Sequence, residues 1–380
     1  MNKTFKAIEK SLVLIEVLKL SEKEILKNSI LREYLLTVSP KEVEELPLEE
    51  KKKYYQIYRS LVLKRKLTNT TPGATTIAPL LKNLTGIICQ YVSKAFTTPN
   101  LKNESEGLEN IPEGPVIFAH THQGILDNFI WNYDLKKHGL ILHNSDVNKA
   151  LLFAQLNTGL VLVDRNDKIS RKNSKLDMVK LLLKGYSMHY FPEGTWNLSP
   201  NRLHLPMSFG IIDTAKKARV PIVPVAHEYI YEEIDGKTII TEAYTVYDKP
   251  IYVSETDNIY DKLEELSASF STMKFSFMKK RGQFKRNNVS NEEYVNFLKA
   301  NNSEMEFGQV QTQSESSNIF GSKEFFYQVC PPNEVPCSKD ENGDWFLDTT
   351  PQRKQLGDDL PTYSQNSISK KRILRSNSKK

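Results

Sequence analysis

The stretch "GPVIFAHTHQGILDNF", Gly114 to Phe129, contains a short apolar run, a polar turn and the start of a second apolar pattern. A brief continuous apolar run such as 115–119 is typical of a buried strand. From Leu126 to His138 the apolar residues recur at helical spacing. The stretch therefore predicts a strand that passes directly into a helix.

The same alternation continues along the chain to about Ile251. Strands are predicted at 114–120, 150–156, 159–165, 187–194, 220–229 and 237–247, with helices at 126–138, 171–185 and 208–219. Several of these strands are apolar without alternation, as expected when helices cover both faces of a sheet. We therefore expect an α/β (α+β layered) domain over residues 77–256, a sheet flanked by helices.

The regions around this domain differ from it in composition. Residues 1–67 repeat apolar side chains at three- and four-residue spacing and are predicted to form a helical extension. Residues 257–300 are predicted to be a basic amphipathic helical segment, since aromatic and basic residues alternate from Phe270 to Asn288 without an acid. Such a segment suits an anionic membrane surface. Residues 301–380 are polar and rich in Ser, Gln and Asn, so we expect them to be largely disordered.

Composition favours an intracellular protein associated with a membrane face. The chain has 380 residues and a net charge of +6, with no apolar run long enough to span a bilayer and no signal-peptide pattern at its start. Its 3 cysteines are widely spaced and form neither a disulfide framework nor a zinc motif. We expect a cytoplasmic protein, peripheral on the membrane. No recognisable nucleic-acid module occurs, so no nucleic-acid partner is expected.

The polar turn within the opening stretch has three interpretations. His120 and His122 with Asp127 could bind a metal, although Gly124 stands where metal hydrolases usually place a further ligand. Alternatively, Asp127 in the first helical turn holds one imidazole nitrogen of His122, and the other nitrogen takes a proton as a general base. The third interpretation is a turn without chemistry. The residues of this turn alone leave all three open.

Three further motifs follow it in order. The four segments are "GLENIPEGPVIFAHTHQGILD" (107–127), "NTGLVLVDR" (157–165), "YFPEGTW" (190–196) and "VPIVPV" (220–225). Together they resemble the glycerolipid acyltransferase family, which includes 1-acylglycerol-3-phosphate acyltransferases. The resemblance covers roughly residues 107–251 and favours the general-base interpretation. It implies an O-acyltransferase of phospholipid biosynthesis.

The resemblance assigns a role to each matching residue. It makes His122 the base that deprotonates an acceptor hydroxyl and Asp127 its partner, while acyl-CoA or acyl-carrier protein supplies the acyl group as co-substrate. Neither a cofactor nor a metal is implied. The remaining assignments are a substrate-binding set, Arg165, Glu193, Gly194, Thr195 and Trp196, and an acyl pocket, Pro221, Ile222, Val223 and Pro224.

The match departs from the family pattern at two positions. Thr121 replaces the asparagine that usually precedes the histidine, and Trp196 replaces the usual arginine or serine after "FPEGT". If that arginine grips a phosphate, the acceptor here is another lysophospholipid or a lipid-like alcohol, unless Arg171, Lys172 and Lys175 compensate. Two alternatives stay open: a metal-dependent hydrolase built on His120, His122 and Asp127, and a lipid-binding scaffold without catalysis.

Overall fold

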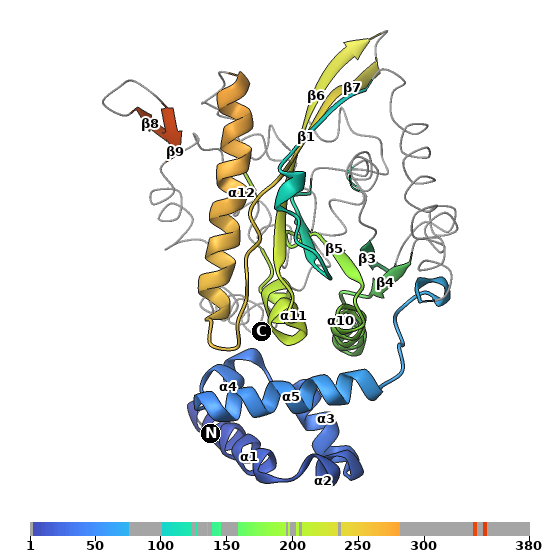
Figure 1. The fold of residues 1–380 in the computed structure, drawn as a ribbon, viewed down its shortest axis with the longest axis vertical. Helices are drawn as coiled ribbons and strands as arrows, with labels where there is room; N and C mark the ends of the chain where they lie inside the picture. The colour runs from blue at the N-terminus through green and yellow to red at the C-terminus, as the bar shows by residue number, and fades with distance from the viewer. Residues whose placement is uncertain are drawn as a thin grey trace, which may run out of the picture.

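A seven-stranded sheet forms the centre of the computed structural model, with the strand order β1-β7-β6-β2-β5-β3-β4 (Figure 1). The structure describes residues 3–75, 101–122, 127, 135, 139–145, 159–194, 197, 203–204, 207–234, 237–281, 337–339 and 345–347. The strands are β1 (Lys102–Glu106), β2 (Ile117–His120), β3 (Gly139–Asn144), β4 (Leu160–Val163), β5 (Ser187–Tyr190), β6 (Ile222–Ile234) and β7 (Lys237–Tyr247).

Five strands of the sheet run parallel. β2 pairs in parallel with β5 and β6, and β3 pairs in parallel with β4 and β5. β7 turns back antiparallel to β6, and β1 runs parallel to β7 at the outer edge. The expected α/β class is confirmed. β2, β4, β5 and β7 lie within the predicted ranges, and β6 begins in its predicted range but continues past residue 229 to Ile234. The strand predicted at 150–156 lies outside the described residues.

Two strands of the seven-stranded sheet were not predicted from the sequence. β3 contains a short apolar run, Gly139–Leu142, that directly follows a charged segment. β1, "KNESE", has no apolar side chain and alternates between exposed and half-exposed residues. An edge strand of this kind is held by backbone pairing to β7 rather than by burial, so hydrophobic periodicity cannot reveal it.

Three helices pack on one face of the sheet. They are α10 (Lys168–Leu183), α11 (Gly210–Ala218) and α12 (Ile259–Arg281). Their apolar residues share one core with Ile117, Ala119 and Leu140 of the strands. The helices predicted at 171–185 and 208–219 are confirmed. Of the helix predicted at 126–138, only Asp127, which is helical, and Leu135 are described.

The opposite face of the sheet changes character along the strands. Its amino-terminal half is apolar and includes Val116, Phe118 and Val223. Side chains alternate along a strand, so His120 lies on the same face as Phe118, and His227 lies on the same face as Val223. Both histidines are fully buried. This face therefore passes from an apolar core into a layer of histidines toward the carboxyl ends of the strands.

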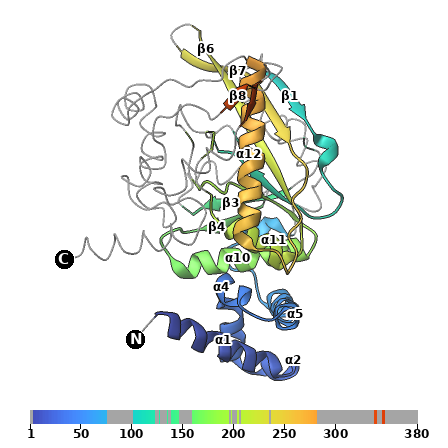
Figure 2. The ribbon, with the colours of Figure 1, turned by 90° about the vertical axis from the view of Figure 1, so that its left-hand side faces the viewer.

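The predicted N-terminal helices are confirmed and form a small bundle. They are α1 (Lys3–Lys19), α2 (Glu22–Lys27), α3 (Ser29–Thr37), α4 (Pro40–Glu44) and α5 (Leu48–Lys64). The bundle packs against the side of the domain formed by α10 and α11 (Figures 1 and 2). Leu14, Tyr54 and Tyr58 belong to the same core as those helices. The N-terminal helices and the sheet domain therefore share one hydrophobic core.

A buried carboxylate joins this bundle to the sheet. Oδ1 of Asp177, on α10, pairs with Arg65 at 2.6 Å, and its Oδ2 accepts hydrogen bonds from the backbone N–H groups of Thr68 and Asn69 at 2.9 and 2.8 Å. Residues 66–72, the linker between the bundle and the sheet, then pair with the edge strand β4, where Thr71 N–H donates to Leu160 O at 2.9 Å. The linker thus covers the edge of the sheet beyond β4.

The described part of the basic aromatic segment packs inward, against the expectation of a membrane-facing surface. Phe270, Phe275 and Phe277 on α12 are buried, and Phe270 is fully so. Lys274 is also buried: its Nζ donates to His227 O at 2.8 Å and pairs with Glu228 on β6. The aromatic spacing over 270–277 therefore reflects core packing. Residues 282–300 lie outside the described residues.

The polar C-terminal region contains one short ordered element. β8 (Cys337–Lys339) and β9 (Trp345–Leu347) pair antiparallel, within a region that was expected to be largely disordered. The other residues of 301–380 lie outside the described part of the chain. Among the helices that are described, none is long and apolar enough to cross a bilayer.

Candidate active site

The carboxyl ends of four parallel strands bring three of the predicted motifs to one edge of the sheet. His122 follows β2, Glu193 follows β5 and Arg165 follows β4, while β3 ends between β5 and β4 with His143 and Asn144. In open α/β sheets this edge is where ligands bind. The parallel order explains why residues 71 positions apart, such as His122 and Glu193, are in direct contact.

His122 and Asp127 form a hydrogen-bonded pair. Nδ1 of His122 lies 2.7 Å from Oδ2 of Asp127, and the side chains are 13% and 0% exposed. Because a carboxylate can only accept, the imidazole carries its proton on Nδ1, and Nε2 is the nitrogen that can take a second one. The partly exposed imidazole and the buried carboxylate thus have the arrangement of a base and its orienting partner.

Asp127 is held at both carboxylate oxygens. The hydroxyl of Tyr229, on β6, donates a hydrogen bond to its Oδ1. Burial alone would raise the pKa of Asp127, but the hydrogen bond and charge of His122, the charge of His227 and the Tyr229 phenol outweigh it, so this pKa lies below its ordinary value. Asp127 is therefore an anion at neutral pH.

The turn after β5 supports His122 from the other side. Oε1 of Glu193 accepts the backbone N–H of His122 at 2.9 Å, and the Glu193 side chain is fully buried. The ring of Phe191 lies 4.1 Å from that of His122, centroid to centroid. Gly194 closes the turn at a φ of 73°, a left-handed conformation that favours glycine. These contacts support a buttressing role for Glu193.

Arg165 joins the second motif to the third. Its Nη1 donates a hydrogen bond to the backbone oxygen of Gly194. The neighbouring Asp167 caps α10, where its carboxylate accepts the backbone N–H groups of Ile169 and Ser170. Arg165 therefore lies beside the turn that supports His122. Thr195 and Trp196, the next two residues of the third motif, lie outside the described residues.

The basic residues on α10 that were candidates to compensate for Trp196 have other partners. Lys172 pairs with Glu33 on α3, and Lys175 pairs with Asp213 on α11. The guanidinium of Arg171 donates to the backbone oxygen of Arg165 at 3.1 Å. Both lysines hold helices together, so they do not replace the missing arginine.

The fourth motif lies deeper in the sheet. In the register of β6 with β2, Ile222 is opposite Ile117 and Pro224 is opposite Ala119. Ile222 and Val223 are fully buried and point into the cores on opposite faces. Pro221 is half-buried at the start of the strand. An acyl-pocket role for 221–224 stays a prediction.

His120 belongs to a buried row of histidines behind the site. Its Nδ1 lies 3.0 Å from Nε2 of His227, and its Nε2 lies 2.8 Å from Nδ1 of His189. Both ring nitrogens of His120 thus face other imidazoles rather than Asp127. No group of three or more His, Cys, Asp or Glu side chains in the described part of the chain is arranged to hold a metal ion. This geometry does not support the metal-hydrolase alternative built on His120.

Thr121, which departs from the family pattern, has a structural role. Its Oγ1 accepts the backbone N–H of His227 at 3.0 Å, and the side chain is buried. The hydroxyl thereby ties the end of β2 to β6, directly before His122. The replacement of asparagine by threonine keeps a hydrogen-bonding side chain at this position.

Two residues near the site were missed by sequence reasoning. Tyr229 contacts Asp127 but lies beyond the fourth motif. His143 lies next to the end of β3. Burial lowers its pKa, and the nearby charges of His122 and Arg165 add to that effect. A signal existed for His143, since it directly follows the apolar run "GLIL". Nothing in the sequence pairs Tyr229 with Asp127.

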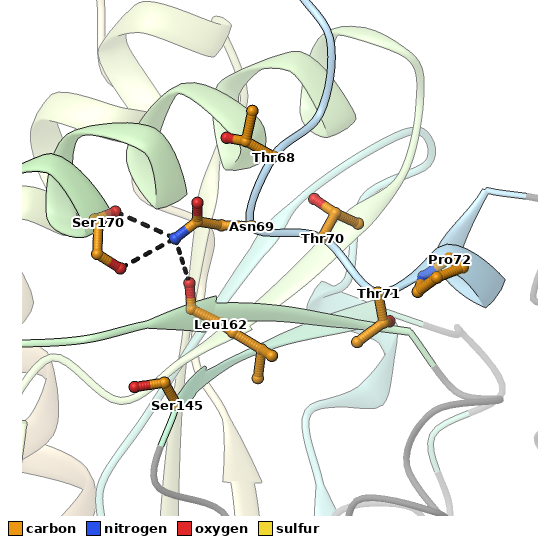
Figure 3. A pocket seen from close by; sticks show the side chains of 8 residues that line it. All are labelled: Thr68, Asn69, Thr70, Thr71, Pro72, Ser145, Leu162 and Ser170. Atoms are coloured by element: carbon orange, nitrogen blue, oxygen red, sulfur yellow. Dashed lines mark hydrogen bonds between the residues drawn. The ribbon is translucent and has the colours of Figure 1, made fainter.

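A separate pocket of about 410 Å³ lies beside β4, at the linker (Figure 3). It is lined by residues 68–72 together with Ser145, Leu162 and Ser170. On one side of the pocket, the side-chain amide of Asn69 connects β4 to α10 by donating hydrogen bonds to Leu162 O at 3.0 Å and to Ser170 Oγ at 3.0 Å. None of the side chains that line this pocket is titratable.

Comparison with known proteins agrees with this geometry. The acyltransferase family model matches residues 102–228, a range that contains the His122, Asp127, Arg165 and Glu193 positions. A chloroplastic 1-acyl-sn-glycerol-3-phosphate acyltransferase of Brassica napus is 29% identical over 183 residues, which are 43% of this chain and 49% of the relative. A second such acyltransferase, of Chlamydomonas reinhardtii, is 28% identical over 34% of this chain and 40% of the relative.

The matched region thus spans about half the length of the curated relatives or less. Among solved structures, the 1-acyl-sn-glycerophosphate acyltransferase PlsC from Thermotoga maritima aligns with a TM-score of 0.34 and 15% identity, over 71% of this chain and 97% of that chain. The family match contains the His122–Asp127 pair and the Glu193 turn, which the fold brings into contact. Over residues 102–228 the chain matches the acyltransferase family, and the curated relatives it resembles are 1-acyl-sn-glycerol-3-phosphate acyltransferases.

Proposed function

We propose that the protein is an O-acyltransferase that transfers a fatty acyl group from acyl-CoA or acyl-carrier protein to the hydroxyl of a lysophospholipid. The observation that carries the proposal is the 2.7 Å contact between His122 Nδ1 and the buried Asp127 carboxylate, with the imidazole still partly exposed. The names of the relatives make 1-acylglycerol-3-phosphate the first acceptor to test.

The proposed reaction uses His122 as general base and then as general acid. Nε2 of His122 takes the proton of the acceptor hydroxyl as the oxygen attacks the carbonyl carbon of the thioester. The carbon–sulfur bond then breaks, and the leaving thiolate takes the proton back from the imidazolium. The products are an ester and a free thiol. Asp127, held ionised, stabilises the imidazolium between the two steps.

The acceptor headgroup is proposed to bind next to Arg165. A guanidinium presents several N–H donors in a planar fork that matches the oxygens of a phosphate, and Arg165 lies beside the Gly194 turn that supports His122. Since Trp196 stands where the family has arginine or serine, the acceptor panel includes lysophospholipids with other headgroups and uncharged lipid alcohols. We propose a cytoplasmic location on a membrane face, where such acceptors reside.

The test is thiol release from a long-chain acyl-CoA, and separately from acyl-carrier protein, with and without each acceptor. Wild type is expected to release thiol only with an acceptor, and His122→Ala to lower kcat about 100- to 10,000-fold, the range of a general base. Asp127→Asn is expected to lose activity as well. The matched control, Asp261→Asn on the exposed side of α12, is expected to keep wild-type rates. If no acceptor raises release by wild type above background with either donor, the proposal is wrong.

A further inference from the structure

The second oxygen of Asp127 has a partner that sequence motifs do not identify. We infer that Tyr229 is a positioning residue, which sets the orientation of Asp127 and, through it, of the His122 imidazole. The role in catalysis rests on the proposed function. The structural part, Tyr229 acting on His122 through Asp127, does not. The observation is the hydrogen bond from the Tyr229 hydroxyl to Oδ1 of Asp127, opposite the Oδ2 that holds His122.

Tyr229 is fixed by the sheet. It lies on β6 opposite Ala243 of β7, and its side chain is 4% exposed. It packs against Ala243 and Leu101, and its ring lies nearly parallel to that of His227 with centroids 6.5 Å apart. A strand residue packed in this way has little freedom, so its hydroxyl is a fixed point for the carboxylate.

A carboxylate bound at both oxygens cannot rotate without losing a hydrogen bond. Removing the phenol hydroxyl would leave Oδ1 of Asp127 buried without that donor, which is costly for a charged oxygen. The carboxylate would then turn toward other donors, and Oδ2 would leave the direction of His122 Nδ1. A misdirected imidazole places Nε2 wrongly for the acceptor hydroxyl, and the cost falls on the chemical step.

Tyr229 also affects the charge state of the pair. Its hydrogen bond is one of the contacts that lower the pKa of Asp127. A carboxylate with a second donor is less basic, so the proton of the imidazolium stays on the ring and remains available for the leaving thiolate. The phenol therefore supports the geometry of the pair and the position of its proton.

The test compares Tyr229→Phe with a matched control. Phenylalanine keeps the ring and its packing and removes only the hydroxyl. The control is Tyr244→Phe, the same change on the neighbouring strand, where the hydroxyl bonds Glu242 on the opposite side of the sheet from Asp127. Tyr229→Phe is expected to lower kcat about tenfold or more, as for a lost hydrogen bond to a charged group, with each KM within about twofold. Tyr244→Phe is expected to match wild type.

Two further measurements distinguish a positioning role of Tyr229 from a general contribution to the local structure. In an Asp127→Asn background, adding Tyr229→Phe is expected to lower kcat by less than about twofold, because residues acting as a unit are not additive. In ¹H–¹⁵N NMR spectra of the histidine rings, Tyr229→Phe is expected to shift the Nδ1 proton of His122, and Tyr244→Phe to leave it unchanged. This second readout does not depend on acyl transfer.

Two results would overturn the positioning role of Tyr229. An unchanged His122 ring spectrum in Tyr229→Phe overturns it, and so does a loss of kcat that is fully additive with Asp127→Asn. If wild type transfers no acyl group, the proposed function fails. A shifted His122 resonance in Tyr229→Phe alone would then still establish that Tyr229 positions the pair.

Discussion

At the scale of single residues, the row of buried histidines depends on neutral imidazoles. His227 lies between His120 and Thr245, with its Nδ1 3.1 Å from the threonine hydroxyl. Burial lowers the pKa of His227 to about 4, despite the opposing charge of Asp127, and burial with its neighbouring histidines holds the pKa of His120 well below its usual range. A neutral imidazole donates a hydrogen bond from one ring nitrogen and accepts one at the other, whereas a protonated ring can only donate. The contacts between these three rings therefore require neutral histidines.

This row predicts a loss of stability in mild acid. In the unfolded chain His227 takes a proton below about pH 6.5, whereas in the folded protein it does so only near pH 4. The contribution of neutral His227 to the free energy of unfolding is therefore fully present above pH 6.5 and is lost as the pH drops toward 4. We expect this loss to be about 2 kcal/mol between pH 7.5 and 5. Urea unfolding at these pH values measures the change. His227→Gln, which cannot take the proton, is expected to have a shallower pH dependence; an equally steep one would contradict the assignment.

At the scale of elements, α12 shows how a sequence pattern can suggest the wrong environment. Its aromatic and basic residues indicate a membrane surface, yet Phe270 and Met273 belong to the core shared with the sheet. Lys274 is buried because Glu228 and a backbone carbonyl of β6 satisfy its charge. A cationic residue is compatible with a core position when a paired strand supplies both partners.

Truncation of Phe270 tests this packing. Phe270→Ala is expected to lower the free energy of unfolding by about 3–5 kcal/mol, the usual cost of removing a buried aromatic side chain. The control is Tyr252→Ala, where the ring is 62% exposed and the expected change is within about 0.5 kcal/mol. Urea unfolding followed by tryptophan fluorescence gives both values. Equal small losses in the two variants would mean that Phe270 is not a core residue.

At the scale of the whole molecule, the N-terminal bundle and the sheet domain share their core and several polar contacts. Arg59 on α5 donates to Lys217 O at 3.0 Å and pairs with Glu255 at 2.9 Å. The ammonium of Lys217 lies 4.9 Å from the centre of the Tyr58 ring. The bundle thus covers α10 and α11 much as a domain layer does, and we expect one cooperative unfolding transition.

Asp177 is another contact between the bundle and the domain: it pairs with Arg65 and accepts three hydrogen bonds from the linker. Asp177→Asn is expected to lower the free energy of unfolding by about 3 kcal/mol, because Arg65 loses its charged partner and an amide cannot accept all these bonds. Urea unfolding measures the loss, with the exposed Asp261→Asn as control. A loss below about 0.5 kcal/mol would show that this contact contributes little.

The sequence by itself determined the α/β class, the N-terminal helices and three of the motifs that meet at the site. It did so because buried strands and amphipathic helices have different apolar periods, and because His122 and Asp127 are close in the chain. Parallel strands also place the residues that follow them at one edge, which brings Glu193 and Arg165 near His122.

Only the tertiary structure decided which other side chains complete the site and where α12 lies. Tyr229 reaches Asp127 from a strand 102 positions further along the chain. His189 and His227 meet His120 through the order of the strands, and β1 is a strand only because β7 offers its edge. Such contacts depend on strand order and register across the sheet, which local periodicity does not encode.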